Sequence, residues 1–206
     1  MLATMEKPRG ADRRSDHDGR APYRSPEHAL ETAYRLESQS VVKVSSLITS
    51  MLGRSIRTSR SAGELTPMDL HAQAAMVLAF VNRLLTPEEL VVVRAHYTVP
   101  AVEYLEIRKN VDVMLLCQQV FDLKDGPKPD RSYVMDSIRT WCGYRQTLGE
   151  RDWARRLKVN ERTLRWWRHG QRGRQWQGFI LPLTVRLAVS TAKLADPMFD
   201  AGLTRI

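Results

Sequence analysis

The 206-residue sequence has little cysteine and no long apolar run. Its two cysteines, Cys117 and Cys142, stand far apart and form no CxxC pair, which favours buried reduced thiols over a disulfide framework or a zinc site. No segment approaches the roughly 18 consecutive apolar residues of a membrane span. The first twenty residues lack the apolar stretch of a secretory signal. We therefore expect a soluble, cytoplasmic protein with no membrane partner, no metal and no other cofactor.

Catalytic and nucleotide-binding motifs are also missing from the sequence. There is no GxxxxGK[ST] phosphate loop, no GxSxG elbow, no HExxH pair and no acid cluster spaced for two-metal nuclease chemistry. We expect a protein that is not an enzyme. A nuclease or integrase-like enzyme stays open as an alternative, and it would require metal-dependent cleavage that is lost when one carboxylate is changed.

The excess positive charge is concentrated in one part of the chain. The formal net charge is +9, and residues 139–174 hold eleven Arg or Lys and three acids, a net of +8. The remainder holds 21 basic and 20 acidic residues. A basic window on an otherwise balanced chain indicates a localised contact with a polyanion, although many basic runs are only solvated helix faces.

The N-terminal quarter of the chain mixes polar segments with one clear helix start. Residues 1–24 have few large apolar groups and are predicted to be a disordered tail. Ser25 and Pro26 predict the N-cap and first position of a helix. The stretch VVKVSSLITSML, residues 41–52, fits a strand by residue type and a helix by spacing, and we favour the helix. Residues 53–64 are predicted to form an exposed loop.

Two further helix starts share one chemistry, a Thr-Pro pair followed by an acid in the first turn. They lie at Thr66-Pro67 and Thr86-Pro87. A third helix is predicted from about residue 100 to residue 123, before the proline-rich segment KDGPKPDR at 124–131. We predict an all-α protein in two parts: a helical domain at 25–123 and a second helical domain at 132–206 that contains the basic window, joined by a linker at 124–131.

The basic window contains the spacing of a helix-turn-helix unit. In the stretch RDWARRLKVNERTLRWWRHG, Ala154 is followed by Val159, Leu164 and Trp167 at five, ten and thirteen residues. Lys158 occupies the turn position that favours glycine, because the backbone there is left-handed. Asn160 is the predicted N-cap of the second helix, which ends at Gly170. Residues 134–147 are predicted to be the third, supporting helix.

This arrangement predicts which side chains contact DNA. The core side of the second helix holds Trp167, and its outer side enters the major groove, where Arg forms bidentate hydrogen bonds with guanine. The predicted base-contacting residues are Glu161, Arg162, Arg165 and Trp166. The predicted phosphate-contacting residues are Arg151, Arg155, Arg156, Lys158, Arg168, His169, Arg172 and Arg174. The alternative is an ordinary aromatic core beneath a basic surface.

The C-terminal stretch FILPLTVRLAVSTAKLADPMF carries an apolar stripe that includes Ile180, Leu183, Leu187 and Leu194. It predicts either a helix that covers the DNA-binding domain or a dimerisation helix, and we favour the first. A homodimer remains a possible partner state, because many helix-turn-helix proteins bind two half-sites as dimers.

Three segments together resemble small phage or prophage regulators. They are the block ELTPMDLHAQAAMVLAFVNR, the helix-turn-helix WARRLKVNERTLRWWRHG and the ending AGLTRI. Some proteins of this type are described as late-gene antitermination proteins. The resemblance implies binding to DNA near a late promoter and loading onto RNA polymerase, with the N-terminal helical part facing the polymerase, at the nucleoid of a bacterial host cell.

The sequence therefore predicts a sequence-specific transcription regulator that binds double-stranded DNA. A DNA-packaging or recombination accessory factor that recognises a DNA site and oligomerises is the alternative reading of the same motif. An RNA-binding module is also open, because Arg and Trp stack on unpaired bases.

Overall fold

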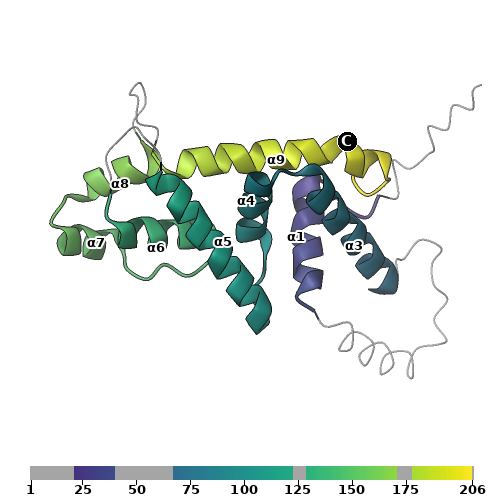
Figure 1. Ribbon diagram of the computed structural model, residues 1–206, viewed down its shortest axis with the longest axis horizontal. Helices are drawn as coiled ribbons and strands as arrows, with labels where there is room; N and C mark the ends of the chain where they lie inside the picture. Colours follow the sequence, from purple (N-terminus) through teal and green to yellow (C-terminus); the bar gives the residue numbers. More distant parts are fainter. Residues whose placement is uncertain (1–20, 40–66, 123–128, 171–177, 206) are drawn as a thin grey trace, which may run out of the picture.

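The computed structural model describes residues 21–39, 67–122, 129–170 and 178–205. Within these residues the chain forms helices and no strand ladder, so the all-α prediction is confirmed (Figure 1). The helices are α1 (Pro26–Glu37), α3 (Pro67–Leu84), α4 (Pro87–Tyr97), α5 (Glu103–Phe121), α6 (Arg131–Trp141), α7 (Glu150–Leu157), α8 (Glu161–His169) and α9 (Ile180–Asp200). Residues 41–52 and the loop predicted at 53–64 lie outside the described residues.

Local capping chemistry starts several of these helices. The Ser25 hydroxyl accepts a hydrogen bond from the backbone N–H of His28 at the start of α1, as predicted. Thr86 and Glu89 form a reciprocal capping box at the start of α4, since each side chain accepts from the backbone N–H of the other residue. Helix α3 begins at the predicted Pro67, while Thr66 lies outside the described residues.

Two apolar cores lie side by side, and α9 runs along both of them (Figure 1). The first core joins α5, α6, α7 and α8 to the start of α9. The second joins α1 and α3 to the end of α9, where Leu194 and Met198 are fully buried. Helix α4 contributes Val92 to the first core and Val93 to the second, and Leu187 of α9 contacts both.

This packing does not confirm a domain boundary at 124–131. Helix α5 lies before that segment but packs with α6, and the end of α9 lies after it but packs with α1 and α3. Helix α6 begins at Arg131, inside the predicted linker, with the Asp130 side chain as its N-cap. Residues 123–128 lie outside the described part of the chain.

The prediction of a disordered tail is wrong for its last residues. Tyr23 is 1% exposed and belongs to the second core. Its backbone N–H donates to the carbonyl of Leu203, and it forms an isolated bridge with Thr204. The sequence pattern missed this contact because its partners lie at the other end of the chain. Residues 1–20 are outside the described residues.

Two ion pairs hold α5 against its neighbours. The buried carboxylate of Asp112 accepts from Arg94 of α4 at 2.6 Å, and Arg108 donates to Glu37 at the end of α1 at 2.7 Å. Buried or half-buried carboxylates need such partners to offset the cost of leaving water. The pairs therefore tie α5 to α4 and to the end of α1.

The position of Leu194 in the second core makes the role of α9 testable. The change Leu194→Ala should lower the free energy of unfolding by about 2–5 kcal/mol, because it opens a cavity at a fully buried site. Val189 on the same helix is 47% exposed, and Val189→Ala should cost less than about 0.5 kcal/mol. Urea unfolding of both variants measures the two costs. Equal losses in the free energy of unfolding would show that the end of α9 does not pack in the second core.

Candidate nucleic-acid interface

Helices α7 and α8 are joined by a tight left-handed turn at Lys158. This residue has φ 54° and ψ 38°, the left-handed conformation predicted for it. The backbone N–H groups of Lys158 and Val159 both donate to the carbonyl of Ala154, which closes the end of α7. Val159 packs partly buried against the first core. The left-handed turn therefore lies at the position that the sequence pattern predicts for it.

The second helix of the unit has the predicted limits. The Asn160 side chain accepts from the backbone N–H of Thr163 at 2.7 Å, which caps α8. Helix α8 ends at Gly170, which has φ 72°. Gly178 then lies against this end: a Cβ atom there would come within 2.5 Å of the Arg168 carbonyl oxygen. Only glycine fits that approach without displacing backbone.

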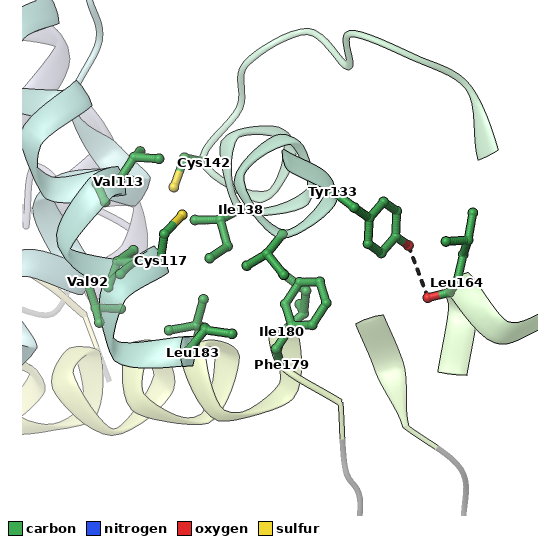
Figure 2. Close-up of a cluster of buried hydrophobic side chains, with 14 of the residues drawn as sticks. Val92, Val113, Cys117, Tyr133, Ile138, Cys142, Leu164, Phe179, Ile180 and Leu183 are labelled. Carbon is green, nitrogen blue, oxygen red and sulfur yellow. Dashed lines mark hydrogen bonds between the residues drawn. The ribbon is translucent and has the colours of Figure 1, made fainter. Parts of the chain in front are cut away.

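The inner side of α8 is anchored on α6 (Figure 2). Leu164 is fully buried, and the Tyr133 hydroxyl donates to its backbone carbonyl at 3.0 Å. Phe179 packs against Tyr133 with ring centroids 6.2 Å apart. These contacts hold α8 by its inner face, while Arg162 and Arg165 on its outer face stay exposed.

Asp136 of α6 organises the loop that precedes α7. Its buried carboxylate accepts from the indole N–H of Trp153 at 2.8 Å and from the backbone N–H of Thr147 at 3.0 Å. The predicted supporting helix at 134–147 is therefore wrong at its end: α6 stops at Trp141, and the following residues form the loop. The sequence carried no signal for this bond, because an acid within an amphipathic helix is usually solvated.

The two adjacent tryptophans are divided less sharply than predicted. Trp167 is half-buried and packs against the first core, with its ring 6.1 Å from that of Tyr133. Trp166 is also half-buried, so it does not project fully into solvent.

The outer side of α8 carries two exposed arginines. Arg162 forms no ion pair with any described residue. Arg165 is 60% exposed and forms ion pairs with Glu150 at 3.3 Å and Glu161 at 3.5 Å. Glu161 also lies 3.6 Å from Arg151, so this carboxylate joins α8 to α7. Three of the four predicted base-contacting residues, Glu161, Arg162 and Arg165, therefore lie on one half-exposed or exposed surface.

The basic residues of α7 and the turn flank that surface. Arg151 and Arg155 are 83% and 80% exposed, and Arg156 and Lys158 are exposed as well. A surface hollow of about 450 Å³ separates α7 from the start of α8, and Arg151, Arg155, Asn160 and Glu161 contribute to its lining. Both arginines are largely exposed and also lie near carboxylates of the same unit, Arg151 at 3.6 Å from Glu161 and Arg155 at 3.7 Å from Asp152.

Arg168 and His169 fit the predicted phosphate role poorly. The side chain of Arg168 is 14% exposed; it donates to the Ser137 hydroxyl at 3.0 Å, lies 3.7 Å from Glu150 and covers the Tyr133 ring. Partial burial and the nearby Arg168 charge lower the pKa of His169, so its ring is neutral at pH 7. Arg172 and Arg174 lie outside the described residues.

Glu150 was missed by the sequence reasoning. It stands in the first turn of α7 and reaches across to both Arg165 and Arg168 of α8. Its sequence position predicts only a favourable interaction with the helix dipole. The contact with α8 depends on the angle between the two helices, which the sequence pattern does not specify.

The described residues offer no metal or thiol chemistry at this surface. They contain no group of three or more His, Cys, Asp or Glu side chains that could hold a metal ion. Cys117 and Cys142 are buried in the first core, and burial raises the pKa of each thiol to about 12. None of the helices in the described ranges combines the length and apolar character needed to cross a bilayer.

Comparison with known proteins finds no matching family model, no matching curated protein and no matching solved structure. The function is therefore inferred from the geometry of the α7–α8 surface.

Replacement of Lys158 tests the strain in the turn. The change Lys158→Gly should raise the free energy of unfolding by about 0.5–1 kcal/mol, because glycine adopts the left-handed conformation without a Cβ clash. Lys158→Ala removes the same charge but keeps the Cβ atom, so it should not stabilise the protein. Thermal or urea unfolding measures both variants. Equal stabilisation by the two would mean that charge, rather than backbone conformation, sets the cost.

Proposed function

We propose that this protein is a sequence-specific double-stranded DNA-binding transcription regulator that inserts α8 into the major groove. The observation that carries the proposal is the outer side of α8, where Arg162 and Arg165 project from a helix anchored by the buried Leu164. A helix about 10–12 Å across fits the major groove of B-DNA. Arginine in that groove hydrogen-bonds to guanine O6 and N7.

The basic residues of α7 are placed to contact the DNA backbone beside the groove that α8 would enter. Arg151, Arg155 and Arg156 are exposed on the helix that precedes the turn, where the first helix of such a unit crosses the DNA backbone. Contacts of these residues with phosphates would fix the register of α8 without reading sequence. Arg168 is assigned instead to holding α8 against α6, because Ser137, Glu150 and the Tyr133 ring surround it.

The acids on this surface would affect how well the protein distinguishes its specific site from other DNA. Glu150 and Glu161 both pair with Arg165. A guanidinium held this way keeps unused N–H groups that can donate to a suitably placed base, but it must give up its ion pairs to follow the phosphates. The two carboxylates therefore penalise non-specific binding more than specific binding.

The role in late-gene antitermination and the contact with RNA polymerase are retained as part of the proposal on the sequence resemblance alone. The α7–α8 surface supports recognition of duplex DNA whether or not the protein acts in antitermination or contacts RNA polymerase. A polymerase pull-down with the full chain, with and without the selected DNA, tests that extension separately.

Selection of bound sequences from a random duplex pool tests the central proposal. We expect one enriched motif, with affinity that falls steeply as salt rises, because bound arginines release counterions from the phosphates. Single-stranded RNA serves as the competitor. Absence of enrichment together with preferential binding to the RNA would contradict the assignment of α8 to a major groove.

Two arginine variants separate base contacts from phosphate contacts. Arg162→Ala should relax the preference at one base pair of the selected motif, at a cost of about 1–3 kcal/mol for that motif. Arg155→Ala should weaken all sequences alike and reduce the slope of log K against log salt by about 1. Gel shifts on the selected motif and on single-base variants measure both effects. Identical behaviour of the two variants would refute the division of roles between α8 and α7.

Removal of the Glu150 carboxylate tests the ion pairing of Arg165. Glu150→Gln should raise non-specific affinity by about fivefold, since it removes one of the two carboxylates that pair with Arg165, and should lower the ratio of specific to non-specific binding. Asp152→Asn removes the same charge from α7 but leaves Arg165 paired, because Asp152 lies beside Arg155 at 3.7 Å. This control should strengthen all sites by a similar factor. A specificity ratio unchanged in Glu150→Gln would remove the proposed role of the acid.

A further inference from the structure

Helix α5 carries an exposed apolar stripe that no described element covers. Tyr104, Ile107, Val111 and Met114 are 59%, 57%, 49% and 61% exposed. They are separated by three, four and three residues. This is the spacing of the a and d positions of a coiled coil, which place side chains along one seam of a helix. Phe121 continues the same spacing seven residues after Met114.

The opposite side of α5 already packs into the protein. Leu105, Val113 and Leu116 are at most 1% exposed. The helix is therefore apolar on two sides, and only one of them is needed for the fold. A helix on the surface of a monomer is normally polar on its outer side, so an outer seam of four large apolar side chains indicates a partner.

We propose that this seam, the α5 seam of Tyr104, Ile107, Val111 and Met114, binds a second copy of the chain in antiparallel orientation. The proposal does not depend on DNA binding. A two-fold axis near residue 109 places Ile107 of each copy against Val111 of the other. It also places Tyr104 of each copy against Met114 of the other. All four layers are then apolar, and the outer two pair a ring with a sulfur atom, a favourable contact.

The charges beside the seam favour this orientation. Glu103 and Glu106 are exposed at its N-terminal end. Beyond its C-terminal end, the exposed Arg131 places its guanidinium 5.2 Å from the centre of the ring of Phe121, which lies seven residues after Met114. An antiparallel pair brings the acidic end of each copy towards the arginine of the other. A parallel pair would place the acids of both copies together, which is unfavourable.

The size of the seam determines how tight the dimer is. Four half-exposed side chains bury on the order of 400 Å² per protomer, about half of a standard interface. We therefore expect reversible association in the micromolar range rather than an obligate dimer.

Sedimentation velocity of the full chain from about 1 to 300 µM should show a monomer that converts to a dimer. Val111→Glu and Ile107→Lys should each raise the dissociation constant at least tenfold. Val185 of α9 is 53% exposed and lies on another apolar surface, so Val185→Glu is the matched control and should dimerise normally. A chain that is monomeric throughout, or a dimer lost only in Val185→Glu, would overturn the proposal.

A mixture of the two α5 variants tests the orientation. In the antiparallel pair, Glu at position 111 of one copy faces Lys at position 107 of the other, while the remaining central layer stays Ile against Val. Mixing should therefore restore association to within about threefold of the unchanged chain. Restored association also shows that both variants are folded. In a parallel pair these positions do not meet, so a lack of recovery on mixing would overturn the antiparallel arrangement.

Discussion

The burial of Leu164 beneath α8 is the contact on which the candidate interface depends. The side chain fills the space against α6, and the Tyr133 hydroxyl fixes the adjacent carbonyl. With the inner side of α8 held in this way, the direction of every outer side chain is determined by the helical period alone. The left-handed turn at Lys158 sets the angle between α7 and α8, so the exposed arginines of both helices border one hollow.

The basic window turns out to serve two purposes. Some of its cations are used within the protein: Arg168 holds α8 to α6, and Arg139 lies over the Tyr144 ring with its guanidinium 4.4 Å from the ring centre. Others, such as Arg151, Arg155 and Arg162, remain in solvent. The net charge of a segment does not separate cations that bind within the protein from cations that stay exposed. That separation depends on which side chains the tertiary packing covers. The exposed group is the one that the proposed DNA contact uses.

Local features were readable from the sequence, and contacts between distant segments were not. Ser25, Thr86 and Asn160 cap helices through bonds to residues three positions away, so their roles follow from short patterns. The turn at Lys158 between α7 and α8 was readable for the same reason. The pairing of Tyr23 with Leu203, and of Glu150 with Arg165, depends on how helices are oriented in space. The predicted division into two domains is not confirmed, because α9 packs against helices from both halves of the sequence.

The course of α9 has a consequence for how the fold is lost. A single helix supplies Leu183 to one core and Leu194 to the other, so neither core can open without exposing part of the same helix. Helices form and melt cooperatively along their length. The two cores should therefore behave as one thermodynamic unit, and amide hydrogen exchange in the middle of α9 should report the global opening of the molecule rather than separate events at its two ends.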